Sequence, residues 1–203
     1  MTDKHPLIYD IEIRKAVPSG AIKAGELDPG IEYCQGWHDH RNMGVACVGA
    51  YDFGSQRYRV FAEDNRAGFI ELANQASVLV GFNNIRFDDA VLNASGWRMP
   101  ESVPRYDILN ELWKAKGLDP ANFSDAHKGH GLEACSMANG GTGKTGHGAE
   151  APKDFQRGRW GSLIDYCLED VRLTKRLFDR ARIDQGILDP TDPSKFVDLT
   201  PPD

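Results

Sequence analysis

The sequence contains few cysteines and no long apolar segment. Four of its 203 residues are cysteines, and no two of them have the C-x-x-C spacing of zinc sites and redox centres. We therefore expect reduced thiols and no disulfide framework. No stretch approaches the ~18–20 apolar residues of a membrane span, and the first residues lack the basic and apolar regions of a signal peptide. These absences favour a soluble, cytoplasmic protein without a membrane partner.

An excess of positive charge is also missing. The chain has 24 Lys and Arg against 30 Asp and Glu, which gives a formal net charge of -6 at pH 7. This balance argues against a protein that coats nucleic acid through a bulk positive field. It leaves open an enzyme that holds one strand end through metal ions and a few local basic residues. With 40% apolar residues, the chain has enough for the core of one ordinary domain.

The order of the predicted elements indicates an α/β domain with a mixed sheet. Strands come first in a meander, and strands and helices alternate later, without internal repeats. Strands are predicted at residues 7–13, 43–53, 56–62, 76–83 and 105–109, and helices at residues 67–76, 87–95, 110–117, 130–138 and 161–182. Between them lie a polar insertion at about residues 14–41 and a glycine-rich loop at about residues 139–152. The Pro-rich tail, residues 187–203, should be extended or partly disordered.

Carboxylates occur where a soluble fold normally buries apolar side chains. On the first strand, Asp10 and Glu12 share one face, so they repel each other unless a cation lies between them. The alternative is an edge strand with a solvated acidic face. On the last helix, Tyr166 and Asp170 are i, i+4 neighbours on one face. Taken alone, that pair also fits a tyrosine at the core boundary and an aspartate in a solvated stripe.

Three motifs in order carry a resemblance to a known family. They are Asp-x-Glu at residues 10–12, Asn-x-x-Phe-Asp at residues 84–88 and Tyr-x-x-x-Asp at residues 166–170. Together they resemble the DEDD superfamily of 3′→5′ exonucleases, and the tyrosine is typical of its DEDDy subclass. The sequence YDIE most resembles the proofreading exonuclease domains of family B DNA polymerases. The resemblance implies a ribonuclease H-like fold over residues 1–186, with a mixed five-stranded sheet, its first three strands antiparallel, and helices on both faces.

The resemblance also implies roles for five residues. Asp10, Glu12, Asp88 and Asp170 would bind two divalent cations, Mg²⁺ or Mn²⁺, and Tyr166 would orient the attacking water. Hard divalent ions take oxygen ligands, and a pair of them can hold the attacking and leaving oxygens of a phosphodiester in line. The histidine subclass has its histidine five residues before the last aspartate, where this chain has an aspartate.

The middle motif leaves two choices open. Asn83 or Asn84 could contact the substrate, and Asn83 matches the spacing of family B polymerases. Asp88 completes the motif, so the adjacent Asp89 is the less favoured ligand. Asp107 falls where relatives often have a further aspartate near the site, but its position also suits a helix N-cap.

The expected partner is the 3′ end of a single strand, with DNA favoured over RNA. Basic side chains can contact the phosphates of such a strand, and aromatic side chains can stack on its bases. The predicted substrate contacts are Asn83, Asn84, Phe87, Lys144, Arg157 and Arg159, with Arg86, Lys153 and Trp160 as further candidates.

Two other patterns suggest different chemistry and are interpreted as incidental. Residues 138–145, ANGGTGKT, match a loose P-loop, but no strand precedes them and GHGAEAP cannot start a helix, so we expect no ATP binding. The histidine pairs at residues 38–40 and 127–130 lack further ligands with zinc spacing. We interpret them as surface histidines.

The leading prediction is a single-strand 3′→5′ exonuclease that releases nucleoside 5′-monophosphates by a two-metal-ion mechanism. The first alternative is a 3′→5′ exoribonuclease of RNA processing, because discrimination at the 2′-OH depends on shape. The second is a non-catalytic nucleic-acid-binding module of the same fold.

Overall fold

The computed structural model describes residues 4–18, 27–143 and 148–202. A five-stranded sheet forms its centre, with strand order β3-β2-β1-β4-β5. The strands are β1 (Leu7–Ile13), β2 (Val45–Asp52), β3 (Arg57–Phe61), β4 (Leu79–Gly81) and β5 (Arg105–Asp107). β1, β2 and β3 are antiparallel neighbours, whereas β4 and β5 run parallel to β1. This is the mixed sheet predicted for a ribonuclease H-like fold, and the fold prediction is confirmed.

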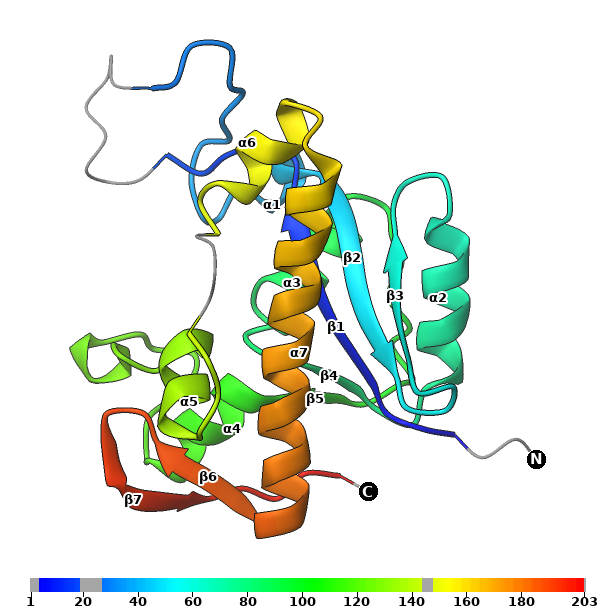
Figure 1. The fold of residues 1–203 in the computed structure, drawn as a ribbon. Coiled ribbons are helices and arrows are strands. Elements are labelled where there is room, and N and C mark those ends of the chain that lie inside the picture. The colour runs from blue at the N-terminus through cyan, green and yellow to red at the C-terminus, as the bar shows by residue number, and fades with distance from the viewer. Residues whose placement is uncertain (1–3, 19–26, 144–147, 203) are drawn as a thin grey trace.

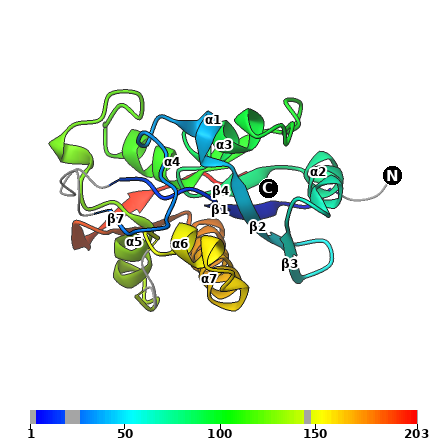
Figure 2. The same ribbon diagram turned by 90° about the horizontal axis from the view of Figure 1, so that it is seen from above.

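Helices cover both faces of this sheet, as the view from above shows (Figure 2). The longest, α7 (Trp160–Asp184), crosses one face, and α2 (Arg66–Gln75) and α3 (Asp88–Ala94) cover the other (Figure 1). The remaining helices are α1 (His40–Met43), α4 (Ile108–Ala115), α5 (Leu132–Ala138) and α6 (Ala151–Gln156). In the described part of the chain, no helix combines the length and apolarity that a membrane crossing requires.

The two faces of β1 have different environments. Leu7, Tyr9, Ile11 and Ile13 pack into the core beneath α2 and α3. Ile8 points to the opposite face and packs against α7. By the strand alternation, Asp10 and Glu12 lie on this second face. β1 is central in the sheet, so the alternative of a solvated edge strand is wrong.

Close packing of α7 on the sheet depends on a glycine. Gly49 of β2 is the partner of Asp10 in the antiparallel register. A Cβ at this position would lie 2.9 Å from the Cys167 Sγ and 3.1 Å from the Val171 Cγ2. A side chain at this position would crowd both atoms, so the absent side chain lets α7 approach β2 closely.

The C-terminal segment differs from the expected extended or disordered tail. β6 (Gly186–Asp189) and β7 (Asp192–Asp198) form an antiparallel hairpin at the end of α7 (Figure 1). Ile187 and Val197 are buried in the same cluster as Phe178 of α7. The prolines suggested a loose tail, because single apolar residues such as Ile187 and Val197 give no periodic pattern from which their burial could be predicted.

The glycine-rich loop is shorter than predicted at its C-terminal end. α6 begins at Ala151, within the predicted range of residues 139–152. Pro152 lies in the first turn of this helix, where the N–H that proline lacks is not needed. In the polar insertion, an isolated bridge pairs Ala16 with Tyr33, and α1 begins at His40.

Candidate active site

One cavity of about 440 Å³ lies between β1, α3, α6 and α7. The five residues predicted to be catalytic all line it. They are Asp10, Glu12, Asp88, Tyr166 and Asp170. Residues 160 positions apart in the sequence therefore meet at one place, because β1 is central and α7 crosses its acidic face. We call this space the acidic cavity.

Three of the four carboxylates are nearly excluded from solvent. Glu12 and Asp170 are each 6% exposed and Asp88 is 4% exposed, whereas Asp10 is half-buried. Ionised carboxylates that lose their hydration need compensating positive charge. A cation in the acidic cavity would supply that charge.

A thiol adjoins the carboxylates of β1. One oxygen each of Asp10 and Glu12 and the Cys167 Sγ lie within 4.8 Å of one another, a grouping that could hold a metal ion. The Cys167 thiol donates to the Asp10 carbonyl oxygen at 3.6 Å. Its hydrogen bond with Cys47, then its burial and the nearby carboxylates, raise the pKa of Cys167 well above the usual value. We therefore expect a neutral thiol here, with oxygen atoms as the main ligands. Sequence reasoning missed Cys167, although it lies three residues before Asp170 on the same helix face.

Asp88 connects α3 to β1. Its Oδ1 accepts a hydrogen bond from the Ile11 backbone N–H at 3.1 Å. Burial raises the pKa of Asp88 well above its usual value, and the charges of Asp107 and Asp89 raise it further. In the absence of a cation, the surroundings thus disfavour the ionised form. A divalent cation would reverse that preference, as the chemistry of a carboxylate ligand requires.

The adjacent Asp89 points elsewhere and does not line the acidic cavity. Its Oδ1 accepts from the Tyr9 hydroxyl at 2.6 Å, and its Oδ2 accepts from the Arg105 Nε at 2.9 Å. Both side chains of the Arg105–Asp89 ion pair are about 15% exposed. Burial, followed by the charges of Asp89 and Asp88, raises the pKa of Tyr9 and keeps its hydroxyl protonated. Asp89 thus has a complete set of protein partners.

The two asparagines of the middle motif also separate. Asn83 lines the acidic cavity and adopts a left-handed backbone conformation, with φ of 64°. Asn84 is fully buried, and its Nδ2 donates to the Tyr9 hydroxyl at 3.1 Å. Asn84 therefore supports the loop from inside, whereas Asn83 is positioned to face a ligand.

Asp107 holds this loop in place and caps α4. Its carboxylate accepts from the backbone N–H groups of Asn83 at 2.9 Å and Ile85 at 3.2 Å. It also accepts from Leu109 at 3.1 Å and Asn110 at 3.3 Å, at the N-terminus of α4. The N-cap alternative is therefore the observed one, and the same contacts position Asn83.

The basic residues predicted to hold phosphates are engaged elsewhere. Arg157 pairs with Asp28 at 3.4 Å, Arg159 with Asp154 at 3.5 Å, and Lys153 with Asp28 at 3.1 Å. None of them lines the acidic cavity. Lys144 lies outside the described residues.

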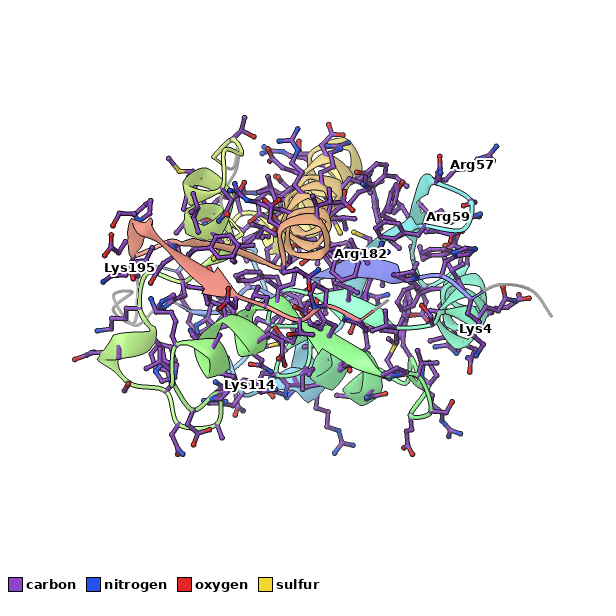
Figure 3. All side chains as sticks on the ribbon, turned by 90° about the horizontal axis from the view of Figure 1, so that it is seen from below. Lys4, Arg57, Arg59, Lys114, Arg182 and Lys195 are labelled. Atoms are coloured by element: carbon purple, nitrogen blue, oxygen red, sulfur yellow. The ribbon has the colours of Figure 1, made fainter. Side chains whose placement is uncertain are left out.

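Several other basic side chains lie at the periphery of the molecule (Figure 3). The figure labels Lys4, Arg57, Arg59, Lys114, Arg182 and Lys195. Trp160, the predicted stacking residue, packs its ring on Phe155 at 5.4 Å. It does not line the acidic cavity either.

The interpretation of all four paired histidines as surface residues is wrong for two of them. His127 and His130 are 4% and 2% exposed. His127 lies against the ring of Trp113 at 4.7 Å, and its Nδ1 accepts from the Ser124 backbone N–H at 3.0 Å. It therefore closes a loop. Loop histidines give no periodic signal, so the sequence could not show their burial.

Comparison with known proteins gives limited information. No family model and no curated protein match the chain. Among solved structures, it is similar to the family B DNA polymerase from the hyperthermophilic archaeon Pyrobaculum calidifontis, with 16% identity and a TM-score of 0.47. The match covers 87% of this chain and 24% of the polymerase, so the chain spans about a quarter of that protein.

Proposed function

We propose that this protein is a metal-dependent 3′→5′ exonuclease of the DEDDy type. It would hydrolyse the last phosphodiester bond of single-stranded DNA and release nucleoside 5′-monophosphates. The observation that carries the proposal is the convergence of Asp10, Glu12, Asp88, Tyr166 and Asp170 on one cavity. Sequence motifs selected these residues before their spatial relation was known, and unrelated motifs have no reason to meet.

The residues fit a divalent metal centre. Carboxylate oxygens suit Mg²⁺ and Mn²⁺, and Asp88, which is 4% exposed, is a buried acid that such an ion would hold in its ionised form. Asp10, Glu12, Asp88 and Asp170 would hold two such ions. Bound there, the ions would lower the pKa of a coordinated water and neutralise charge on the leaving 3′ oxygen.

The remaining residues would position the reactants. Tyr166 faces the same cavity as the carboxylates, and its hydroxyl would align the attacking water. Asn83 would contact the terminal nucleotide through its amide. The apolar wall, which includes Phe82 and Phe87, would exclude bulk water from the reacting phosphate.

The test uses single-stranded DNA and RNA labelled at either end, incubated with Mg²⁺, Mn²⁺ or a chelator. We expect shortening from the 3′ end, dependent on metal and strongly reduced in Asp10→Asn. Asp165→Asn is the matched control, because Asp165 is exposed on α7 next to Tyr166 and does not line the cavity. It should retain activity. Full activity in Asp10→Asn or in chelator, or degradation from the 5′ end, would overturn the proposal.

The same experiment separates the alternatives. If the protein cleaves RNA faster than DNA, its substrate is RNA and it is an exoribonuclease. Metal-dependent binding of a strand without any cleavage would indicate a non-catalytic module. For either outcome, removal of one buried carboxylate would show whether the acidic cavity is responsible for the RNA cleavage or for the metal-dependent binding.

A further inference from the structure

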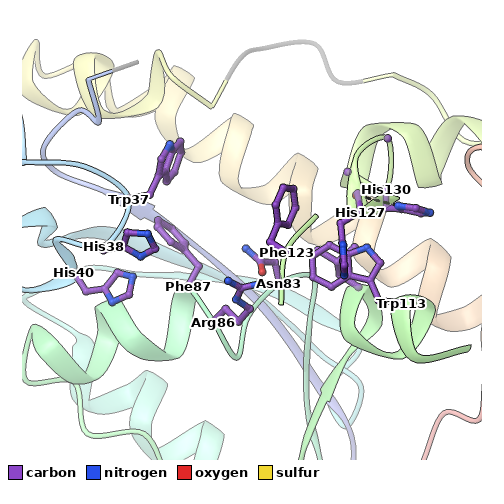
Figure 4. A pocket seen from close by; sticks show the side chains of 13 residues that line it. Trp37, His38, His40, Asn83, Arg86, Phe87, Trp113, Phe123, His127 and His130 are labelled. Carbon is purple, nitrogen blue, oxygen red and sulfur yellow. Dashed lines mark hydrogen bonds between the residues drawn. The ribbon is translucent and has the colours of Figure 1, made fainter. Parts of the chain in front are cut away.

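A second cavity of about 390 Å³ adjoins the acidic cavity. Trp37, Asn83 and Phe87 line both spaces, so the two are neighbours with a shared wall. It lies between the segment that leads into α1 and the loop that leads into α5 (Figure 4). We call it the aromatic groove.

The chemistry of the groove is the opposite of that of the acidic cavity. No Asp or Glu is among the described residues that line it, and Arg86 is its one guanidinium. Figure 4 shows aromatic rings on either side of Asn83 and Arg86. Its main aromatic lining consists of Trp37, Phe87, Trp113 and Phe123.

Two of these rings are exposed although they are large and apolar. Trp37 is 63% exposed and Phe123 is 59% exposed. They come from separate loops, one on each side of the groove. Folding gains little from such exposed rings, so their place on one groove points to a ligand with flat apolar surfaces.

The rings are held in place by the protein. Trp37 meets Phe87 edge to face at 5.9 Å, and Phe123 packs on His127 at 5.3 Å. The Arg86 guanidinium donates to the Pro120 carbonyl oxygen at 2.9 Å and so connects the floor of the groove to the loop of Phe123. The stacking surfaces are therefore preorganised.

Resting on the exonuclease function proposed above, we infer that the aromatic groove binds unpaired bases of the nucleotides immediately 5′ of the one released. When the terminal phosphodiester lies at the carboxylates, the rest of the strand must leave the acidic cavity, and the groove is the neighbouring space, with Trp37, Asn83 and Phe87 in the shared wall. Stacking accepts any base because every base has a π-face. A base must leave the stack of a duplex before it can stack on these rings, so the groove would favour single strands and would be largely indifferent to sequence.

The first measurement is kinetic and compares dinucleotides with single strands of at least five nucleotides. Trp37→Ala and Phe123→Ala should each raise KM for the longer strands roughly 5- to 100-fold, as loss of a stacked ring does, with kcat nearly retained. Hydrolysis of dinucleotides should change less, because few bases reach the groove. Trp37→Phe keeps a ring and should restore most of the loss.

The second measurement is binding in chelator, followed by the fluorescence anisotropy of a labelled strand, and needs no catalysis. The alanine variants should weaken binding by the same factor as the rise in KM. Tyr58→Ala is the control, because Tyr58 is 40% exposed but lies on β3, at the opposite edge of the sheet from β5. It should bind normally. Trp160→Ala tests the site that the sequence suggested, and a larger effect there than at Trp37 would contradict the inference.

The two proposals fail in different ways. If the protein hydrolyses single strands but neither KM nor anisotropy changes in Trp37→Ala and Phe123→Ala, the groove inference is wrong and the exonuclease function stands. If no strand is hydrolysed but anisotropy detects binding that depends on Trp37, the exonuclease function fails while the groove still binds bases.

Discussion

The acidic cavity and the aromatic groove share a wall but differ in their lining side chains, which are carboxylates in the first and aromatic rings in the second. One encloses carboxylates that folding would rather leave in water. The other presents aromatic rings that folding would rather bury. Each arrangement is unfavourable for a protein that has only to fold, and each becomes favourable with a ligand, a cation in the first and nucleobases in the second. In the function proposed above, these neighbouring departures from folding preference are two parts of one site.

The largest expected contrast is kinetic. Asp10→Asn or Asp170→Asn should lower kcat by on the order of 10²- to 10³-fold, the size seen when one preorganised electrostatic group is removed. The aromatic variants should raise KM and leave kcat nearly intact. Steady-state kinetics on labelled single strands measures both. If carboxylate and aromatic variants changed the same kinetic constant, the assignment of chemistry to the acidic cavity and of strand binding to the aromatic groove would be wrong.

The second contrast is thermodynamic and involves pH. The pKa of Asp88 is raised in the folded state, so the folded protein favours the protonated carboxyl. The stability that this preference contributes is fully present below the unfolded-state pKa of ~3.9, and it is lost as pH rises through the higher pKa of the folded state. The metal-free protein should therefore lose stability over that interval. A cation favours the ionised carboxylate, so Mg²⁺ or Mn²⁺ should stabilise more at about pH 7.5 than at about pH 5.

Thermal unfolding at both pH values measures this effect. A cation at 100 times its Kd should stabilise by about 2.7 kcal/mol, a shift of several degrees in Tm for a chain of this size. Asp88→Asn should remove the pH-dependent part and raise the stability of the metal-free protein. An equal cation effect at both pH values would count against Asp88 as a ligand.

A smaller kinetic effect is expected at Tyr166. Tyr166→Phe removes only the hydroxyl, so the carboxylates and the proposed ions remain. We expect kcat to fall by about 10- to 100-fold, as for groups that orient a metal-bound reactant, and the stabilisation by Mn²⁺ to persist. A loss as large as that of Asp10→Asn would show that Tyr166 does more than orient water.

The smallest effect separates two adjacent residues. Asp89→Asn should cost about 1–3 kcal/mol of stability, because it weakens the contacts with Tyr9 and Arg105. It should leave the stabilisation by metal unchanged, in contrast to Asp88→Asn. Chemical denaturation with and without Mn²⁺ distinguishes the two variants. If metal no longer stabilises Asp89→Asn, the assignment of Asp88 and Asp89 to different roles is wrong.

Much of the fold and the acidic cavity could be predicted because local patterns determine them. The alternation of residues 7–13 identified the face of β1 that carries Asp10 and Glu12. The i, i+4 spacing of Tyr166 and Asp170 likewise placed both on one side of α7. Regular elements convert sequence spacing into direction. That the separated motifs form one site was implied by the family resemblance and not by the spacing.

The loop residues could not be predicted in this way. Trp37 and Phe123 lie in segments without periodicity, so nothing in the sequence showed that they face each other across a groove. Arg157 and Arg159 suggested phosphate contacts because they are basic and near an aromatic residue. Both form ion pairs at the surface, with Asp28 and Asp154, so their part in substrate contact stays a prediction. One of these partners is 129 residues distant in the sequence, and sequence proximity could not indicate it.

Gly49 gives the acidic cavity an adjustable width. β1 carries Asp10 and Glu12, α7 carries Asp170, and the spacing between strand and helix depends on a position with no side chain. The methyl group added in Gly49→Ala would crowd the Cys167 Sγ and the Val171 Cγ2, and any shift of α7 that relieves this contact would change the spacing of the two sets of carboxylates. Mg²⁺ demands oxygen ligands at about 2.0–2.1 Å, whereas larger ions tolerate longer bonds. We therefore expect Gly49→Ala to shift binding preference from Mg²⁺ towards larger ions, measurable by calorimetric titration. Unchanged preference would mean that the carboxylates adapt independently of α7. A shift in preference would show that ion selectivity in this protein is tuned by a residue that touches no ion.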